Sequence, residues 1–160
     1  MKPSIYIETS VISYLTSRPS ADAIVLARQQ RTHELWSLFG VTCEPFISSL
    51  VTEEISRGDV NAAARRIEAC RDCASFTVTD AARSIAKRLI DSGAIPATEP
   101  EDALHIGIAH AASVDYIASW NFAHLVGPNA KLKLQLRLAA LGLAPIPIAT
   151  PDEILEELAL

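Results

Sequence analysis

Short apolar runs of the kind found in buried strands alternate along the chain with longer stretches of helical periodicity. The apolar runs cover residues 5–7, 45–47, 76–78, 116–118 and 146–148. The helical stretches lie near residues 21–39, 49–57, 60–72, 80–92, 100–113 and 129–141, with a last one at 151–158. Strands separated by helices need crossover connections, so this order predicts an α/β fold with a mostly parallel sheet covered by helices on both faces.

Several of these elements carry signals at their ends. Residues 150–153 (TPDE) form a capping box with proline at the first helical position, and Gly58 and Gly142 are typical helix stops. Pro147 cannot donate a ladder hydrogen bond, which predicts that the last strand lies at a sheet edge. Residues 131–138 alternate with period two, as a strand does, but the residues that flank them favour a helix, which we predict.

The length and composition indicate one domain that covers residues 1–160. Apolar residues make up 49% of the chain and charged residues 21%, which is typical of a globular core. The net charge of −5 argues against strong non-specific binding to a nucleic-acid duplex, which needs many cations. An acidic site whose charge is offset by a bound metal remains compatible with this balance.

Neither a membrane segment nor a disulfide framework is indicated. The longest apolar run, residues 139–149, is broken by a glycine and two prolines and is shorter than the roughly 18 residues that a membrane span needs. Three cysteines cannot all pair, which is typical of a reducing compartment. The Cys-x-x-Cys at residues 70–73 ends a helix and has too few companions for a thiolate zinc site. We therefore expect a soluble, cytoplasmic protein with no membrane partner.

Polar residues follow two of the predicted strands directly. Glu8 comes after the first strand and Asn121 comes just after the fourth. In an open parallel sheet, ligands bind beyond the carboxyl ends of the strands, near the point where the strand order reverses. We therefore expect Glu8 and Asn121 to meet across neighbouring strands.

Glu54 lies on the helix that follows the second strand, next to a natural control, Glu53. At 100° per residue, Leu50, Val51 and Ile55 define the buried stripe of this helix, and Glu54 falls inside that stripe while Glu53 points away from it. A buried carboxylate needs a partner or a metal. An internal salt bridge, to a residue such as Arg57 or Lys2, is the alternative explanation.

Asp102 lies in the first turn of a helix, where an acid after proline is ordinary N-terminal chemistry. On this pattern alone, Asp102 is a helix-start residue. However, residues 103–112 are almost all apolar, so the helix is buried, and an acid at its end is placed to face a cleft.

Together, Glu8, Glu54, Asp102 and Asn121 form an oxygen-rich set at one edge of the sheet. Oxygen ligands with few histidines suit Mg²⁺ or Mn²⁺ better than Zn²⁺. His105 and His124 either line the same cleft or are structural histidines. The basic side chains that are candidate phosphate contacts, if they are not simply solvated helix faces, are Arg28, Arg31, Arg65, Arg66, Lys131, Lys133 and Arg137.

Four short motifs resemble those of the PIN domain family, in the same order. Residues 6–12 (YIETSVI) resemble its opening strand that ends in an acid, and residues 48–58 (SSLVTEEISRG) resemble its second motif, with Glu54 four residues before glycine. Residues 102–106 (DALHI) resemble the aspartate that opens a buried helix, and residues 119–125 (SWNFAHL) resemble the fourth motif. The similarity runs from residue 4 to about 150 and is greatest to VapC-like toxins of toxin–antitoxin pairs.

This resemblance implies a three-layer PIN-like fold with a five-stranded parallel sheet flanked by helices. It also implies a Mg²⁺- or Mn²⁺-dependent endoribonuclease that acts on RNA, such as tRNA, forms a homodimer and is held inactive by a cognate antitoxin. In this assignment Glu8 and Asp102 are direct metal ligands, Glu54 holds a metal-bound water or a second ion, and Asn121 positions water or a phosphate oxygen.

Two alternatives stay open at this point. Glu8 stands where the family usually has aspartate, and Asn121 stands where it usually has an acid. These changes leave a non-catalytic PIN-fold module that binds protein or RNA as an alternative. A receiver-like phosphoryl acceptor would use Asp80 after the third strand, but it also needs a lysine after the fifth strand, where residues 150–151 are Thr-Pro.

Overall fold

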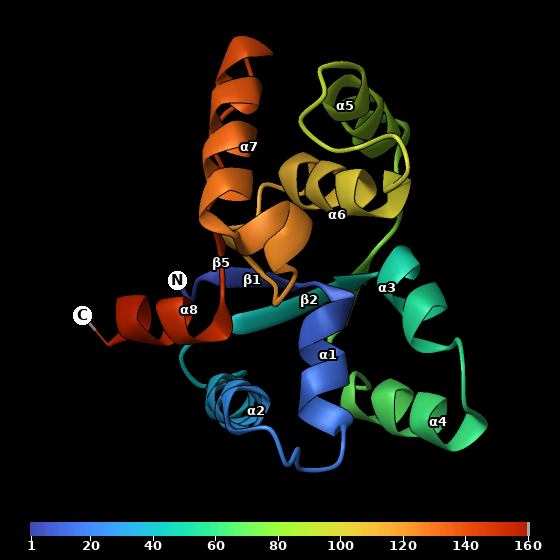
Figure 1. Cartoon of the computed structure of the whole chain (residues 1–160), viewed down its shortest axis with the longest axis vertical. Helices are drawn as coiled ribbons and strands as arrows, with labels where there is room; N and C mark the ends of the chain where they lie inside the picture. The colour runs from blue at the N-terminus through green and yellow to red at the C-terminus, as the bar shows by residue number, and fades with distance from the viewer. Residues whose placement is uncertain (160) are drawn as a thin grey trace.

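Five strands form one all-parallel sheet in the order β3-β2-β1-β4-β5. The computed structural model describes residues 1–159. The strands are β1 (Ser4–Ile7), β2 (Glu44–Ser48), β3 (Ala74–Phe76), β4 (Tyr116–Ala118) and β5 (Ile148–Ala149). The sheet confirms the predicted fold class. Figure 1 shows the path of the chain from the N-terminus to the C-terminus.

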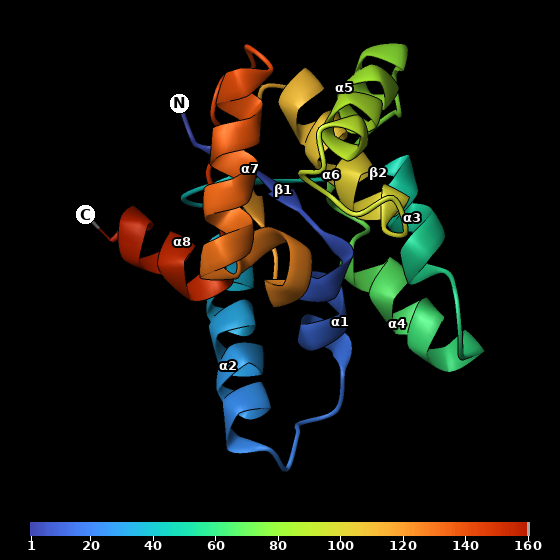
Figure 2. The same ribbon diagram turned by 45° about the horizontal axis from the view of Figure 1, so that its top comes forward.

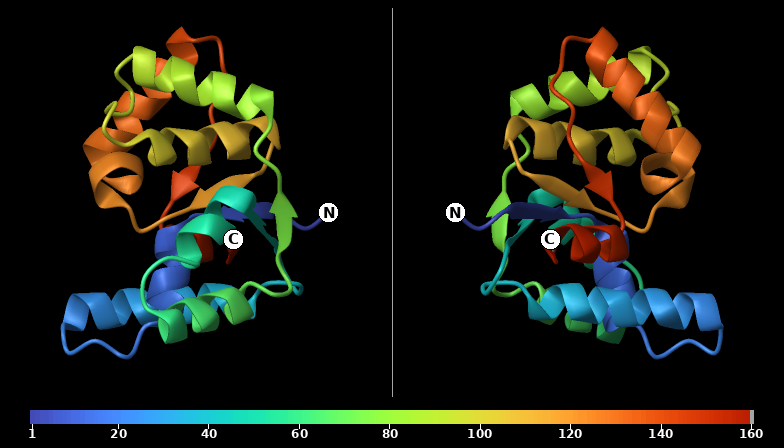
Figure 3. Two further views of the ribbon diagram at one scale, coloured as in Figure 1. Left: turned by 90° about the vertical axis from the view of Figure 1, so that its right-hand side faces the viewer. Right: turned by 90° about the vertical axis from the view of Figure 1, so that its left-hand side faces the viewer.

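Helices cover the sheet from both sides, so the fold has three layers. They are α1 (Thr9–Thr16), α2 (Ala23–Ser37), α3 (Ser49–Ile55), α4 (Val60–Ala69), α5 (Asp80–Asp91), α6 (Pro100–Ala111), the π-helical turn η1 (Phe122–Val126), α7 (Pro128–Ala140) and α8 (Pro151–Leu158). Figure 3 shows α5, α6 and α7 on one side of the sheet, and α1, α2 and α4 on the other.

The strand order puts the first strand at the centre of the sheet. β1 pairs with β2 on one side and with β4 on the other, and the side chains of Ile5, Tyr6 and Ile7 are fully buried. The next residue, Glu8, is still held in the sheet, because its backbone N–H donates to the carbonyl of Ala118 at 3.0 Å. The carboxyl ends of β1 and β4 therefore lie together, as predicted for Glu8 and Asn121.

β1 begins one residue earlier than the sequence predicts, β2 is one residue longer at each end, and β3 and β5 are shifted. β3 covers Ala74–Phe76 instead of residues 76–78, because its last residue pairs with Ser48, where β2 ends. β5 is shorter than predicted, but it lies at the sheet edge as Pro147 requires. Two helical elements, α1 and η1, lie outside the ranges expected from the sequence.

The segment with period-two alternation is helical, as predicted. In α7, Leu134 and Leu138 are buried, whereas Leu132 and Leu136 are exposed. The buried leucines are four residues apart, so they lie on one face of a helix. Gly142 follows α7 with a φ of +70°, a left-handed conformation in which glycine avoids the steric cost of a side chain. The capping box at Thr150 and Glu153 is also present. Within residues 1–159, no helix is both long and apolar enough to cross a membrane.

Helix α6, which carries Asp102, packs unusually close to α5. A Cβ atom on Gly107 would lie 2.3 Å from the carbonyl oxygen of Ala82 and 3.3 Å from the backbone nitrogen of Ala86. Both contacts are with backbone, which cannot rotate away. Glycine at this position therefore sets the distance between the two helices.

We expect Gly107→Ala to destabilise the protein by about 2 kcal/mol, because overpacking outweighs the roughly 1 kcal/mol gain in helix propensity. Equilibrium unfolding in urea measures the change. The control Ala111→Leu adds volume at an exposed position of the same helix and should stay within about 0.5 kcal/mol of the parent. An unfolding midpoint for Gly107→Ala at or above that of the parent would contradict the close packing.

Candidate active site

Glu8 lies at the junction between β1 and α1, where it caps the helix. Its carboxylate accepts a hydrogen bond from the backbone N–H of Ser10 at 3.2 Å and one from the Ser10 hydroxyl. The hydroxyl of Ser119 donates a further bond, at 2.7 Å. The side chain is buried. The position of this carboxylate is therefore fixed by the residues that follow β1 and β4.

The turn after β4 connects Glu8 to Asp102. The Ser119 hydroxyl oxygen accepts a bond from the backbone N–H of Asn121 at 2.9 Å. The Asn121 side chain caps η1 by accepting from the backbone N–H of His124 at 3.1 Å. Its amide nitrogen donates to Oδ1 of Asp102, also at 3.1 Å. Asn121 thus aims its donor at the candidate ligand Asp102.

Asp102 has an unused acceptor. Its second oxygen, Oδ2, is buried and has no hydrogen-bond partner among residues 1–159. Burial raises the pKa of Asp102 above its ordinary value, the bond from Asn121 opposes this, and the negative charge of Glu8 adds to it. A buried carboxylate in this position is stabilised when a cation binds to it.

Glu54 belongs to a buried hydrogen-bond network that crosses the sheet. Its Oε1 accepts from the Thr9 hydroxyl at 2.8 Å and lies 2.6 Å from Nε2 of His105. On the other side of the imidazole, Nδ1 lies 2.8 Å from the hydroxyl of Tyr6, which in turn contacts Ser48 at 2.9 Å. Three of these five residues, Tyr6, Ser48 and His105, are almost completely buried.

The charges in this network support one another. Burial raises the pKa of Glu54, but the hydrogen bonds from His105 and Thr9 outweigh it, and the net pKa is lowered. Burial lowers the pKa of His105, but the bond to Glu54 and the nearby acids raise it above its ordinary value. An ionised carboxylate only accepts hydrogen bonds, so Nε2 of His105 is the donor to Glu54.

A second cluster of possible ligands includes Asp102. One ligand atom each from Glu99, Asp102 and His124 lies within 4.8 Å of the others. Glu99 is the N-cap residue of α6, but its side chain makes no capping hydrogen bond. His124 comes from η1. These three side chains can approach a single cation together.

The residues singled out in the sequence occupy one region of the protein. Hydrogen bonds lead from Glu8 through Ser119 and Asn121 to Asp102, and Glu54 joins the region through His105, which is one helical turn after Asp102. The metal-type cluster, however, contains Asp102 and neither Glu8 nor Glu54 among its members.

Glu53 and Glu54 behave as the helical wheel predicts. The side chain of Glu53 is 69% exposed and that of Glu54 is 15% exposed. The partners considered for Glu54 were wrong, because Arg57 pairs with Glu53 and Glu101 instead, and Lys2 pairs with Glu44. The partner is His105. The sequence placed it on the same helix face as Asp102 but did not connect it to Glu54.

Sequence reasoning treated Glu99 as part of the helix start and left the role of His124 open. The sequence carries only a weak signal for Glu99. Proline at position 100 begins the helix, and a glutamate before it is a poor helix cap. A side chain that does not cap its helix is free to serve another purpose.

No family model and no curated protein matches this chain. The parallel order β3-β2-β1-β4-β5 is consistent with PIN-like folds. The geometry of the site therefore carries the functional argument.

Proposed function

We propose that this protein is a Mg²⁺- or Mn²⁺-dependent endoribonuclease, similar to VapC-like toxins, that hydrolyses RNA phosphodiester bonds. The observation that carries the proposal is the buried oxygen of Asp102 that has no partner within residues 1–159. The Asp102 carboxylate also offers a ligand atom close to those of Glu99 and His124, and Asn121 holds its other oxygen, Oδ1. A cation-binding carboxylate at the end of a parallel sheet is typical of metal-dependent phosphodiester chemistry.

The side chains present fit one divalent cation. Asp102, Glu99 and His124 would hold it, with two carboxylates and one imidazole as ligands. When bound, such an ion lowers the pKa of a coordinated water and neutralises charge on a phosphate. The chain itself orients the ligands: Asn121 fixes the rotamer of Asp102, and Ser119 and Ser10 fix Glu8. Glu8 and Glu54 are not among these three ligands. They add negative charge around the ion.

The remaining parts of the proposal follow from the resemblance described above. The substrate is RNA, such as tRNA, and the partners are a cognate antitoxin and a second copy of this chain. In the enzyme, Glu8, Glu54 and Asn121 complete the catalytic set around the cation that Asp102, Glu99 and His124 hold.

A catalytically weakened PIN-fold module that binds protein or RNA is the second candidate. The observation that favours it is the state of Glu8, whose carboxylate is already engaged by Ser10 and Ser119. A carboxylate with several donors has less capacity to bind a metal directly. A cleavage assay separates the two functions.

The proposed function is tested with purified protein, tRNA and a structured RNA, in the presence of Mn²⁺ or Mg²⁺. We expect endonucleolytic products that appear with metal and stop when a chelator is added. Metal-independent cleavage, or intact RNA under all conditions together with no metal binding in calorimetry, would overturn the proposal and favour the binding module.

If His124 is a ligand, its imidazole should affect which metal the site binds. Nitrogen ligands suit Mn²⁺ better than Mg²⁺, which prefers oxygen. We expect His124→Gln to weaken Mn²⁺ binding roughly tenfold and to leave Mg²⁺ binding nearly unchanged, as measured by calorimetry. The matched control is His33→Gln, an exposed histidine on α2. Unchanged binding of Mn²⁺ would show that His124 is not a ligand, and equal losses for both metals would contradict the predicted selectivity.

A further inference from the structure

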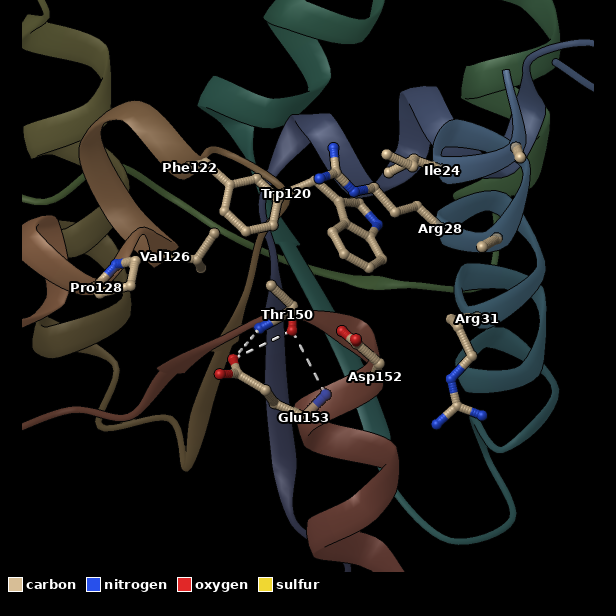
Figure 4. A pocket seen from close by; sticks show the side chains of 12 residues that line it. Ile24, Arg28, Arg31, Trp120, Phe122, Val126, Pro128, Thr150, Asp152 and Glu153 are labelled. Atoms are coloured by element: carbon tan, nitrogen blue, oxygen red, sulfur yellow. Dashed lines mark hydrogen bonds between the residues drawn. The ribbon is translucent and has the colours of Figure 1, made fainter. Parts of the chain in front are cut away.

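A pocket lies beside the turn that carries Asn121 of the candidate active site, with both chain neighbours of Asn121 in its lining. It has a volume of about 590 Å³, and it is formed by α2, Trp120, η1, the first residue of α7 and the N-terminal end of α8. Figure 2 shows these elements converging below α7, and Figure 4 shows the side chains that line the pocket. The proposed function does not use this pocket.

One wall of the pocket is aromatic and carries a cation. The guanidinium of Arg28 lies 4.5 Å from the ring centre of Phe122 and 5.6 Å from that of Trp120. The Trp120 ring is held in place, because its indole N–H donates to the buried hydroxyl of Thr32 at 2.8 Å. Phe122 is 41% exposed, so part of its ring is open to a ligand. Rigid rings beside an arginine plane are the surfaces on which nucleic-acid bases stack.

The opposite wall carries an unused hydrogen-bond acceptor. Asp152 lines the pocket from the first turn of α8. Within the described part of the chain it has no lysine or arginine partner, and its buried Oδ1 has no hydrogen bond. Its neighbour Glu153 is already engaged by Lys131 and by the capping box. The carboxylate of Asp152 can therefore accept from an N–H group of a ligand.

The pocket is directly connected to the candidate active site. Trp120 and Phe122 are the two neighbours of Asn121, which donates to Asp102. The backbone N–H of Trp120 also donates to the hydroxyl of Ser10, at 2.8 Å, and Ser10 bonds to Glu8. An RNA strand with one phosphate near Asp102 would therefore place an adjacent nucleotide beside the pocket.

Resting on the proposed function, we propose that this pocket is a base-recognition subsite that binds a guanine nucleotide of the RNA. Guanine offers a large face for stacking on Phe122 and Arg28. Its edge carries two adjacent donors, N1–H and the 2-amino group, for the carboxylate of Asp152. Arg28 and Arg31 supply positive charge for the phosphate.

Binding of nucleotides without metal tests the subsite separately from catalysis. Calorimetry with 5′-GMP and 5′-IMP, in the presence of a chelator, gives the affinities. The indole N–H signal of Trp120, assigned with Trp36→Phe, reports where the nucleotide binds. We expect GMP to shift this signal and to bind about fivefold or more tightly than IMP, which lacks the 2-amino group.

Two variants and their controls locate the contacts. Phe122→Ala should weaken GMP binding by about fivefold or more, the lower limit for losing one base stack. Asp152→Asn should remove the preference for GMP over IMP. The controls are Leu136→Ala, an exposed apolar residue of α7, and Glu156→Gln, an exposed acid of α8, and both should bind GMP as the parent does.

The possible outcomes separate the subsite from the enzyme. Absence of GMP binding at millimolar concentration, or binding that leaves the Trp120 signal unmoved, overturns the subsite even if the protein cleaves RNA. Equal binding of GMP and IMP overturns the role of Asp152 and with it the guanine assignment. Binding of GMP as expected by a protein that cleaves no RNA would support the pocket and overturn the proposed nuclease.

Discussion

Asp102→Asn should abolish both metal binding and RNA cleavage while leaving the fold intact. Asparagine keeps the shape of the side chain and can still contact Asn121, but it removes the charged oxygen that has no partner among the described residues. Because a catalytic metal supplies several kcal/mol of charge stabilisation, we expect cleavage to fall roughly 100-fold or more. Calorimetry with Mn²⁺ should show that binding at the site is lost.

Thermal unfolding gives an independent measure of the same change. A ligand at 100 times its dissociation constant stabilises the folded state by about 2.7 kcal/mol, which corresponds to a rise of roughly 5–10 °C in Tm for a chain of this size. We expect Mn²⁺ to raise the Tm of the parent and not that of Asp102→Asn.

Without metal, the same variant should be at least as stable as the parent. The pKa of Asp102 is raised in the folded state, chiefly by burial, so its ionised form is disfavoured by folding at neutral pH. A neutral amide avoids that cost.

The matched control is Asp80→Asn. Asp80 also lies in the first turn of a helix, but it is exposed and outside the candidate site. The Asp80→Asn variant should gain thermal stability from Mn²⁺ and cleave RNA as the parent does. If Asp102→Asn keeps the cleavage rate of the parent, or still gains stability from Mn²⁺, then Asp102 is not a metal ligand and the candidate site is wrong.

The sequence predicts those parts of the site that depend on local periodicity. The helical repeat alone distinguishes Glu54 from Glu53, because the face of a short amphipathic helix is set by three apolar residues. Pro147 alone places the last strand at an edge, because it lacks a donor. The rule that ligands bind at the carboxyl ends of parallel strands placed Glu8 and Asn121 together, and the ends of β1 and β4 do lie side by side.

The parts that sequence reasoning missed depend on contacts between distant segments. The place of His124 depends on η1, a π-helical turn that Asn121 caps and for which the sequence has no periodic signal. The pocket beside Trp120 needs α2 and α8, which are more than 100 residues apart, to pack against each other. No pattern within either helix indicates that neighbour.

The buried network around His105 should be among the strongest contributors to stability. His105→Ala removes the partner of Glu54 and of the Tyr6 hydroxyl at once, and leaves a cavity between α6 and β1. Breaking a buried charge pair costs about 3–5 kcal/mol, and the 15% exposure of Glu54 places this pair at the lower end, so we expect a loss of about 3 kcal/mol. Urea unfolding measures the loss, with an unchanged m-value as evidence that the folded state stays compact.

Tyr6→Phe shows how much of that effect comes from a single hydrogen bond. It keeps the ring in the core but leaves Nδ1 of His105 and the hydroxyl of Ser48 without their partner, so we expect a loss of about 1–2 kcal/mol. The control Glu53→Gln breaks only an exposed ion pair with Arg57 and should cost less than about 1 kcal/mol. If His105→Ala were no less stable than Glu53→Gln, Glu54 would need another source of stabilisation, and its lowered pKa would not arise from His105. The predicted order of the three losses therefore tests whether the carboxylate beside the candidate metal site is held by the protein core itself.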